Sequence, residues 1–228
     1  MSDQLWLWSF VLLIPALFLG IYAQVKVSTS FSRYSQVRSA RGLTGAQAAR
    51  MLLDSAGLGE VEIRVGGMRL SDHYDPRDRT LTLSPDVGLS DSLAALGVAA
   101  HEVGHAIQHA EGYPAFRLRS ALVPAANLGT NLGIVLFLIG LIFFRSGMLM
   151  GVGILLYSAA VLFTLVTLPV ELNASRRALA LLDERNILLP DEVSGARKVL
   201  SAAALTYVAA ALMAVLQLLR LIMISRRS

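Results

Sequence analysis

The residues whose chemistry stands out are His101, Glu102 and His105, which belong to the string HEVGH. Residues four apart on an α-helix lie on one face, so both imidazoles can face one metal ion. Glu102 lies one position round the helix, where its carboxylate can reach a metal-bound water without itself being a ligand. Zinc lowers the pKa of such a water toward about 7, and Glu102 would accept the proton as the water attacks a carbonyl. The spacing therefore predicts metal-assisted hydrolysis.

The alternative for this motif is a pair of core histidines with ordinary hydrogen bonds. The flanking residues Val98, Ala99, Ala100, Val103 and Gly104 are small and uncharged, as close packing around a buried metal requires. Two imidazoles and a carboxylate on an otherwise apolar helix are costly to bury without a partner. The burial cost favours the metal site.

A catalytic zinc site needs a third protein ligand and an open position. His109 is nearest in sequence, but it lies two turns beyond His101 and about 80° further round the helix. The longer pattern with glycine at position 108 and histidine at 111 is not met, because these residues are Gln108 and Glu111. We therefore expect His109 to have a structural or interfacial role.

Glu171 is the stronger candidate for the third ligand. It follows Pro169 at the end of an apolar stretch, and a carboxylate at membrane depth is a functional-site candidate by default. A kink at Pro169 would turn the Glu171 side chain sideways. Two alternatives stay open: Glu171 pairs with Arg176 or Arg177, or His73 supplies the ligand.

Composition places the chain in a membrane. Of its 228 residues, 55% are apolar and 16% are charged, whereas soluble domains carry about a quarter charged residues. The absence of cysteine excludes disulfides and thiolate ligands. The net charge of +4 fits membrane topology better than nucleic-acid binding, and no RNA-binding motif accompanies it.

A helix needs about 20 apolar residues to cross a bilayer. Four apolar stretches reach this length, at roughly 5–23, 121–144, 148–170 and 202–224. The expected organisation is an N-terminal transmembrane anchor at 1–24, a small domain with the HEVGH helix at 25–120, a transmembrane hairpin at 121–170, a cytoplasmic helix with the third ligand at 171–201, and a C-terminal transmembrane helix at 202–228. The chain is thus expected to be a multi-pass protein of the cell membrane.

The positively charged residues are distributed unequally among the segments between the spans. Eleven Lys or Arg residues lie between the first and second spans and five between the third and fourth, whereas Arg145 stands alone in the hairpin turn. The positive-inside rule therefore predicts that the catalytic domain lies on the cytoplasmic side. Arg226 and Arg227 would then lie outside, which leaves the topology of the last span open.

Two helices are expected in the small domain. Thr44 and Gln47 have the spacing of a capping box, which predicts a helix that begins there and stops at Gly57. A second helix, which carries the metal motif, is expected from Ser90 to Ala110 with Ser90 as its N-cap.

Alternating apolar residues predict strands at Val61–Val65 and Thr80–Ser84, with a short strand near Met68–Ser71 between them. The expected arrangement is a small antiparallel meander. The predicted fold class is therefore a mainly α integral membrane protein with about four transmembrane helices and a small α+β domain.

Three strings, HEVGHAIQHAEGYP, DHYDPRDRTLTLS and ELNASRRAL, resemble the YugP-type membrane zinc metallopeptidases over nearly the whole chain. The chain is more distantly similar to the gluzincin membrane proteases, the HtpX-like and CAAX-prenyl endopeptidases. The resemblance implies a zincin-like domain that binds one Zn2+ per chain through His101, His105 and Glu171, with Glu102 as the base. Ser175 stands where that distant group has aspartate, and a serine at this position can hydrogen-bond a ligand histidine without a charge.

The resemblance also implies a strand that pairs with the substrate backbone. The candidate is the strand made of Thr80, Leu81, Thr82 and Leu83, and the alternative is an ordinary core strand. An electrophilic helper for the oxyanion is expected as well, with His73 or Tyr74 as candidates.

The function that follows is a membrane-embedded zinc endopeptidase that cleaves membrane-associated or unfolded polypeptides near the bilayer surface. Its partners would be a polypeptide substrate and the lipid bilayer, with no nucleic acid. One alternative is a metal-binding membrane scaffold without proteolysis, although the presence of Glu102 favours an enzyme. A transporter is disfavoured, because residues 121–170 hold only Asn127, Asn131, Arg145 and a few hydroxyls as polar groups.

Overall fold

The computed structural model describes residues 9–68 and 71–226. Four helical stretches in this part of the chain are long and apolar enough to cross a membrane, namely Ser9–Tyr34, Pro114–Phe144, Gly147–Glu184 and Pro190–Ser225. The expectation of a mainly helical protein with four candidate spans and a small α+β portion is confirmed. The part of the predicted N-terminal anchor before residue 9 lies outside the described residues.

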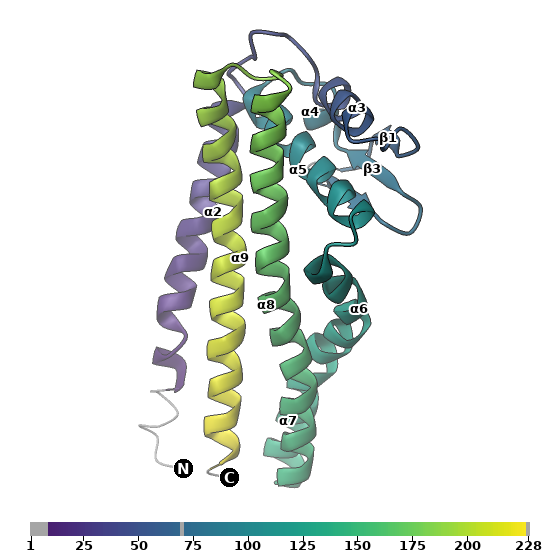
Figure 1. Ribbon diagram of the computed structural model, residues 1–228. Coiled ribbons are helices and arrows are strands. Elements are labelled where there is room, and N and C mark those ends of the chain that lie inside the picture. Colours follow the sequence, from purple (N-terminus) through teal and green to yellow (C-terminus); the bar gives the residue numbers. More distant parts are fainter. Residues whose placement is uncertain (1–8, 69–70, 227–228) are drawn as a thin grey trace. The chain divides into compact units, whose positions relative to one another are not determined.

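The elements follow one another along the chain as helices with one short sheet between them (Figure 1). They are α2 (Ile14–Tyr34), α3 (Gly45–Ser55), β1 (Glu62–Val65), β2 (His73–Asp75), β3 (Thr80–Leu83), α4 (Pro85–Gly88), α5 (Leu93–Ala110), α6 (Pro114–Leu128), the π-helical turn η1 (Gly129–Gly133), α7 (Ile134–Ile139), the π-helical turn η2 (Gly140–Phe144), α8 (Gly147–Glu184) and α9 (Pro190–Ser225).

The chain forms two compact units. The sheet-containing unit comprises Gln24–Phe116 and Val170–Leu205, and the helical unit comprises Met1–Ala23, Arg117–Pro169 and Thr206–Ser228, within the described residues. Segment 171–201 therefore groups with the small domain. It is not the single helix that we expected, because α8 continues through Pro169 to Glu184 and a turn precedes α9. Asn186 adopts a left-handed conformation in this turn, and Pro190 begins the next helix.

The core of the sheet-containing unit is made of leucine, valine and alanine side chains from α3, β3, α5, α8 and α9. Helix α3 begins as predicted, because the Thr44 hydroxyl accepts the Gln47 N–H and the Gln47 side chain accepts the Thr44 N–H. Gly57 takes a positive φ of 73° just after the helix ends. Leu52 and Leu53 of α3 are fully buried in this core.

The sheet is mixed, so the predicted antiparallel meander is wrong. Its strand order is β1-β3-β2, with β1 parallel and β2 antiparallel to β3. The most buried strand, β3, takes the centre, with Leu81 and Leu83 fully buried. The second strand is His73–Asp75 rather than Met68–Ser71: Met68 and Ser71 lie in a loop, and Arg69 and Leu70 lie outside the described residues.

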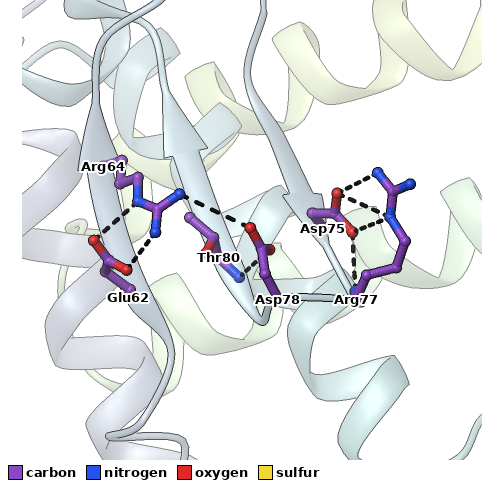
Figure 2. Close-up of polar contacts among 6 residues, drawn as sticks. All are labelled: Glu62, Arg64, Asp75, Arg77, Asp78 and Thr80. Carbon is purple, nitrogen blue, oxygen red and sulfur yellow. Dashed lines mark hydrogen bonds and ion pairs between the residues drawn. The ribbon is translucent and has the colours of Figure 1, made fainter.

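Polar contacts hold the ends of the strands (Figure 2). Asp75 accepts hydrogen bonds from the backbone and guanidinium of Arg77, and Asp78 accepts the Thr80 N–H, which together order the turn from β2 to β3. The Arg77 guanidinium also lowers the pKa of Asp75 to about 2. On β1, Arg64 pairs with Glu62 at 2.6 Å and approaches Asp78 at 3.8 Å. Because β2 and β3 are joined by this tight turn, they pair as a hairpin.

Helix α5 begins two residues later than predicted. Ser92 is its N-cap, and its hydroxyl accepts the Ala95 N–H at 3.2 Å. Ser90, the predicted N-cap, instead donates its hydroxyl to Ser92. At its middle, α5 approaches α8 closely: a Cβ on Gly104 would lie 2.7 Å from the Ala174 carbonyl oxygen. Only glycine permits this distance between the two helices.

The helical unit is a set of apolar helices with its own core. Phe137, Met150, Tyr157, Val161 and Leu221 are buried together in it. A short turn separates the second and third apolar stretches: η2 ends at Phe144, Arg145 adopts a left-handed conformation, and α8 starts at Gly147.

We predict that Gly104→Ala destabilises the sheet-containing unit, because the added methyl would overlap the α8 backbone. Overpacking of this kind costs about 1–3 kcal/mol, so thermal unfolding of the purified protein should shift down by several degrees. Gly151→Ala in α8 is the matched control, since a Cβ there meets nothing within 4 Å. Equal melting temperatures for the two variants would contradict the assigned α5–α8 packing.

Candidate metal centre

Three side chains from two helices converge in the sheet-containing unit. His101 and His105 come from α5, with ring centroids 4.7 Å apart, and Glu171 comes from α8. Oε2 of Glu171 lies 3.1 Å from Nε2 of His101 and 3.5 Å from Nε2 of His105. Potential ligand atoms of the three residues all lie within 4.8 Å of one another. The carboxylate of Glu171 is 2% exposed.

The geometry and chemistry of this group fit a zinc ion. Ligand atoms about 2.0–2.1 Å from a tetrahedral zinc stand about 3.3 Å apart, close to the two measured separations between Glu171 and the histidines. Two imidazole nitrogens and one carboxylate oxygen are also a ligand set that catalytic zinc uses. Three protein ligands leave a fourth position for water or substrate.

The electrostatics of the group also favour a cation. Burial acts to lower the pKa of His105, but the hydrogen bond with Glu171 and the charge of Glu102 act in the opposite direction and raise it above its ordinary value. A buried imidazole whose pKa is raised despite burial marks a site of negative potential. A metal cation would satisfy the same potential.

Arg177 does not serve as the partner of Glu171 in this structure. Its guanidinium lies 2.6 Å from Glu111, and its Nε donates to Asn173 at 2.8 Å. Arg176, the other arginine considered, is exposed. The Glu171 carboxylate is directed to the two histidines instead.

Gln108 orients His105 through a chain of hydrogen bonds that the sequence did not reveal. Its Nε2 donates to the Val170 carbonyl at 2.8 Å and to Oδ1 of Asn173 at 2.9 Å. Its Oε1 must then face Nδ1 of His105, 3.0 Å away, so this nitrogen carries the hydrogen. In the neutral ring, Nε2 of His105 then carries the lone pair that a metal ligand requires, on the side of Glu171.

A sequence signal for Gln108 did exist. A glutamine three residues after His105 lies on the same side of the helix, within an otherwise apolar run. Gln108 is fully buried, and a buried amide needs partners for its donors and its acceptor. Its partner Asn173 lies 65 residues away in the chain, so the pairing could not be read from spacing.

Ser175 contacts the His101 ring at the nitrogen that does not face Glu171. The Ser175 hydroxyl lies 3.1 Å from Nδ1 of His101, while Nε2 of the same ring faces Glu171. Ser175 is one helical turn after Glu171 on α8, so both residues reach the same imidazole. A neutral hydroxyl supports the ring here without a second carboxylate.

The Glu102 carboxylate contacts the sheet through one of its two oxygens. Its Oε2 accepts the backbone N–H of Tyr74 at 3.1 Å, and the side chain is 8% exposed. Tyr74 belongs to β2, and its hydroxyl lies 2.9 Å from Nδ1 of His109. The base candidate is thus fixed by a strand that packs beside α5.

The two remaining histidines lie apart from this group. Among the described residues, the cluster that could hold a metal consists of His101, His105 and Glu171. His73 is exposed on β2, with its Nδ1 2.7 Å from the Ser71 carbonyl. His109 is occupied with Tyr74. The structure therefore does not bring His73 or His109 to the metal group.

The strand expected to pair with a substrate cannot do so by adding a strand to the sheet. Thr80, Leu81, Thr82 and Leu83 form β3, whose two edges are already paired with β1 and β2. Backbone pairing with a further chain requires a free strand edge. This expectation is therefore corrected: β3 is a core strand.

Comparisons with known proteins agree with the chemistry of the site. A family model described as "Putative neutral zinc metallopeptidase" matches residues 9–226. The chain is 47% identical over 213 residues to a Bacillus subtilis (strain 168) protein described as "Putative membrane protease YugP", covering 93% of this chain and 94% of that protein. No solved structure matches the chain.

We predict that Gln108→Leu weakens zinc binding about 10- to 100-fold, the usual effect of removing a group that orients a ligand histidine. The substitution removes the acceptor for Nδ1 of His105 and leaves the ring free to rotate. Zinc affinity should be measured by competition with a chelator, with His109→Ala on the same helix as the control. An affinity for Gln108→Leu equal to that of the control would contradict this role.

Proposed function

The chain belongs to the neutral zinc metallopeptidase family, and we propose that it is a membrane-embedded, gluzincin-like zinc endopeptidase. The observation that carries the proposal is the convergence of two imidazole Nε2 atoms and a buried carboxylate, with a second carboxylate on the adjacent residue of α5. Such a constellation is suited to hydrolysis of peptide bonds.

His101, His105 and Glu171 would hold one zinc ion per chain. When bound, zinc supplies Lewis acidity, which polarises the substrate carbonyl and acidifies a water molecule. Ser175 and Gln108 would keep the two imidazole rings in the orientation that directs Nε2 to the ion. The rest of the chemistry falls to the protein's own carboxylate.

Glu102 would act as the general base and then as the general acid. Its Oε2 is held by the Tyr74 N–H, which leaves Oε1 to take a proton from the attacking water. As the carbonyl carbon forms its bond to the water oxygen and the C–N bond breaks, Glu102 returns this proton to the leaving amine. His73, which the sequence offered as an oxyanion helper, lies apart from the metal group, so we do not assign this role to it.

The proposed substrates are membrane-associated or unfolded polypeptides. Glu171 belongs to α8, one of the four helices long and apolar enough to cross a bilayer, and it follows Pro169 by two residues. A ligand carried by such a helix supports cleavage close to the membrane surface. The reaction needs an extended backbone at the metal, which a flexible polypeptide can supply.

We predict that Glu102→Gln keeps zinc but lowers cleavage about 100-fold or more, since the amide cannot accept the proton. Glu171→Ala should lose zinc and cleavage together, because it removes a ligand. Both variants can be compared in detergent-purified protein by metal analysis and by cleavage of an unfolded protein substrate.

The same measurements separate the enzyme from a metal-binding scaffold. Cleavage that survives in Glu102→Gln would exclude Glu102 as the base, and absence of cleavage in the unmodified protein would favour the scaffold. Full zinc occupancy in Glu171→Ala would move the third ligand to another residue.

We also propose that the sheet-containing unit lies on the cytoplasmic side. The support is the distribution of charge, with Lys and Arg concentrated in the two segments that this unit combines and Arg145 in the hairpin turn between α6–η2 and α8.

This topology can be tested with single cysteines, because the chain has none of its own. Ala56→Cys lies on the exposed end of α3, and Gly147→Cys lies at the hairpin turn. A membrane-impermeant maleimide added to intact cells should label Gly147→Cys alone, whereas both should react after lysis. Labelling of Ala56→Cys in intact cells would place the unit outside.

A further inference from the structure

A basic pocket lies between α2 and α9 in the sheet-containing unit, away from the metal group. It has a volume of about 380 Å³. Four cationic side chains, Lys26, Arg33, Arg197 and Lys198, line it, together with hydroxyl groups that include Thr29 and Ser201. Several cations in one cavity are the groups that bind a phosphate ester, whereas the Thr29 hydroxyl donates to the Val25 carbonyl of its own helix.

Tyr34 forms a rigid wall of this basic pocket. Its ring packs against the core of the unit, and it meets α9 where Gly195 leaves room: a Cβ on Gly195 would lie 3.0 Å from the ring. Arg33 and Lys198 are placed 5.6 and 5.9 Å from the ring centroid. The aromatic face therefore holds two of the four charges in position.

Three of the four charges of the pocket form no ion pair in the part of the chain that the structure describes. Among the residues that the structure describes, Arg33, Arg197 and Lys198 form no ion pair, whereas Arg38 and Arg50 elsewhere in the unit pair with aspartates. Glu192 lies close in sequence on α9, but its carboxylate accepts the backbone N–H groups of Ala40 and Leu189. Three adjacent cations are thus left for an anion from outside.

Along the sequence, both helices of the pocket continue into apolar stretches. On α2, the exposed apolar residues Phe18, Ile21 and Val25 come directly before Lys26. On α9, the exposed apolar residues Val208 and Leu212 follow Ser201. In each helix the basic residues thus lie at the end of the lipid-compatible stretch, which is the level of phospholipid headgroups.

We infer that the basic pocket binds the phosphate of an anionic phospholipid headgroup. The cations take the phosphate, and the acyl chains of the same lipid extend into the bilayer. A free phosphate ion would neutralise the cations but would gain nothing from the apolar stretches that follow them along both helices. This inference is independent of the proposed peptidase activity.

Native mass spectrometry of the full-length protein in a neutral detergent tests the inference. The protein is titrated with phosphatidylglycerol, with phosphatidylcholine of the same acyl chains, and with inorganic phosphate alone. We expect phosphatidylglycerol to bind at least tenfold more tightly than either of the others. The triple variant Arg33→Gln/Arg197→Gln/Lys198→Gln should lose about 10- to 100-fold in this affinity.

Two further variants make the result specific to the pocket. Arg41→Gln/Arg176→Gln/Arg185→Gln removes the same number of exposed charges from the same unit and should bind phosphatidylglycerol like the unmodified protein. Arg33→Lys/Arg197→Lys/Lys198→Arg keeps the charges and should retain most of the affinity. Equal losses in both glutamine variants would overturn the inference, and binding of inorganic phosphate as tightly as lipid would overturn the assignment to a phospholipid.

Discussion

The close approach of α5 to α8 is the contact on which the candidate site depends. Gly104 lets the backbones come together beside Ala174, and this distance brings Glu171 between His101 and His105. A carboxylate at 2% exposure is stable only with compensating charge or hydrogen bonds. The two imidazoles supply that compensation in the structure, and a metal ion would supply more of it.

The second feature of the site is its rigidity. A chain of polar contacts runs from Glu111 through Arg177, Asn173 and Gln108 to His105, and each member fixes the donor and acceptor roles of the next. Such a network determines which imidazole nitrogen is free to bind a metal. The network also ties the end of α5 to α8, so helix packing and ligand orientation are set by the same residues.

The sheet-containing unit combines this site with a basic pocket on α2 and α9. Glu171 of the site lies on α8, and the basic pocket lies on α2 and α9. All three helices are apolar enough over most of their length to span a bilayer. A lipid headgroup in the pocket would hold these helix ends at the depth of the membrane interface. A hydrolytic site in the same unit would then act on polypeptides that reach that interface.

Local patterns in the sequence determined the spanning helices, the capping box at Thr44 and the pairing of His101 with His105, because each depends on spacing within one helix. Glu171 could be singled out because a carboxylate beside an apolar stretch is unusual. The order of the strands and the role of Gln108 depended on tertiary contacts. β3 became central because burial selects the most apolar strand, and Gln108 found Asn173 only once α5 lay against α8. Contacts between residues far apart in the chain leave no periodic signal, so the structure alone could decide them.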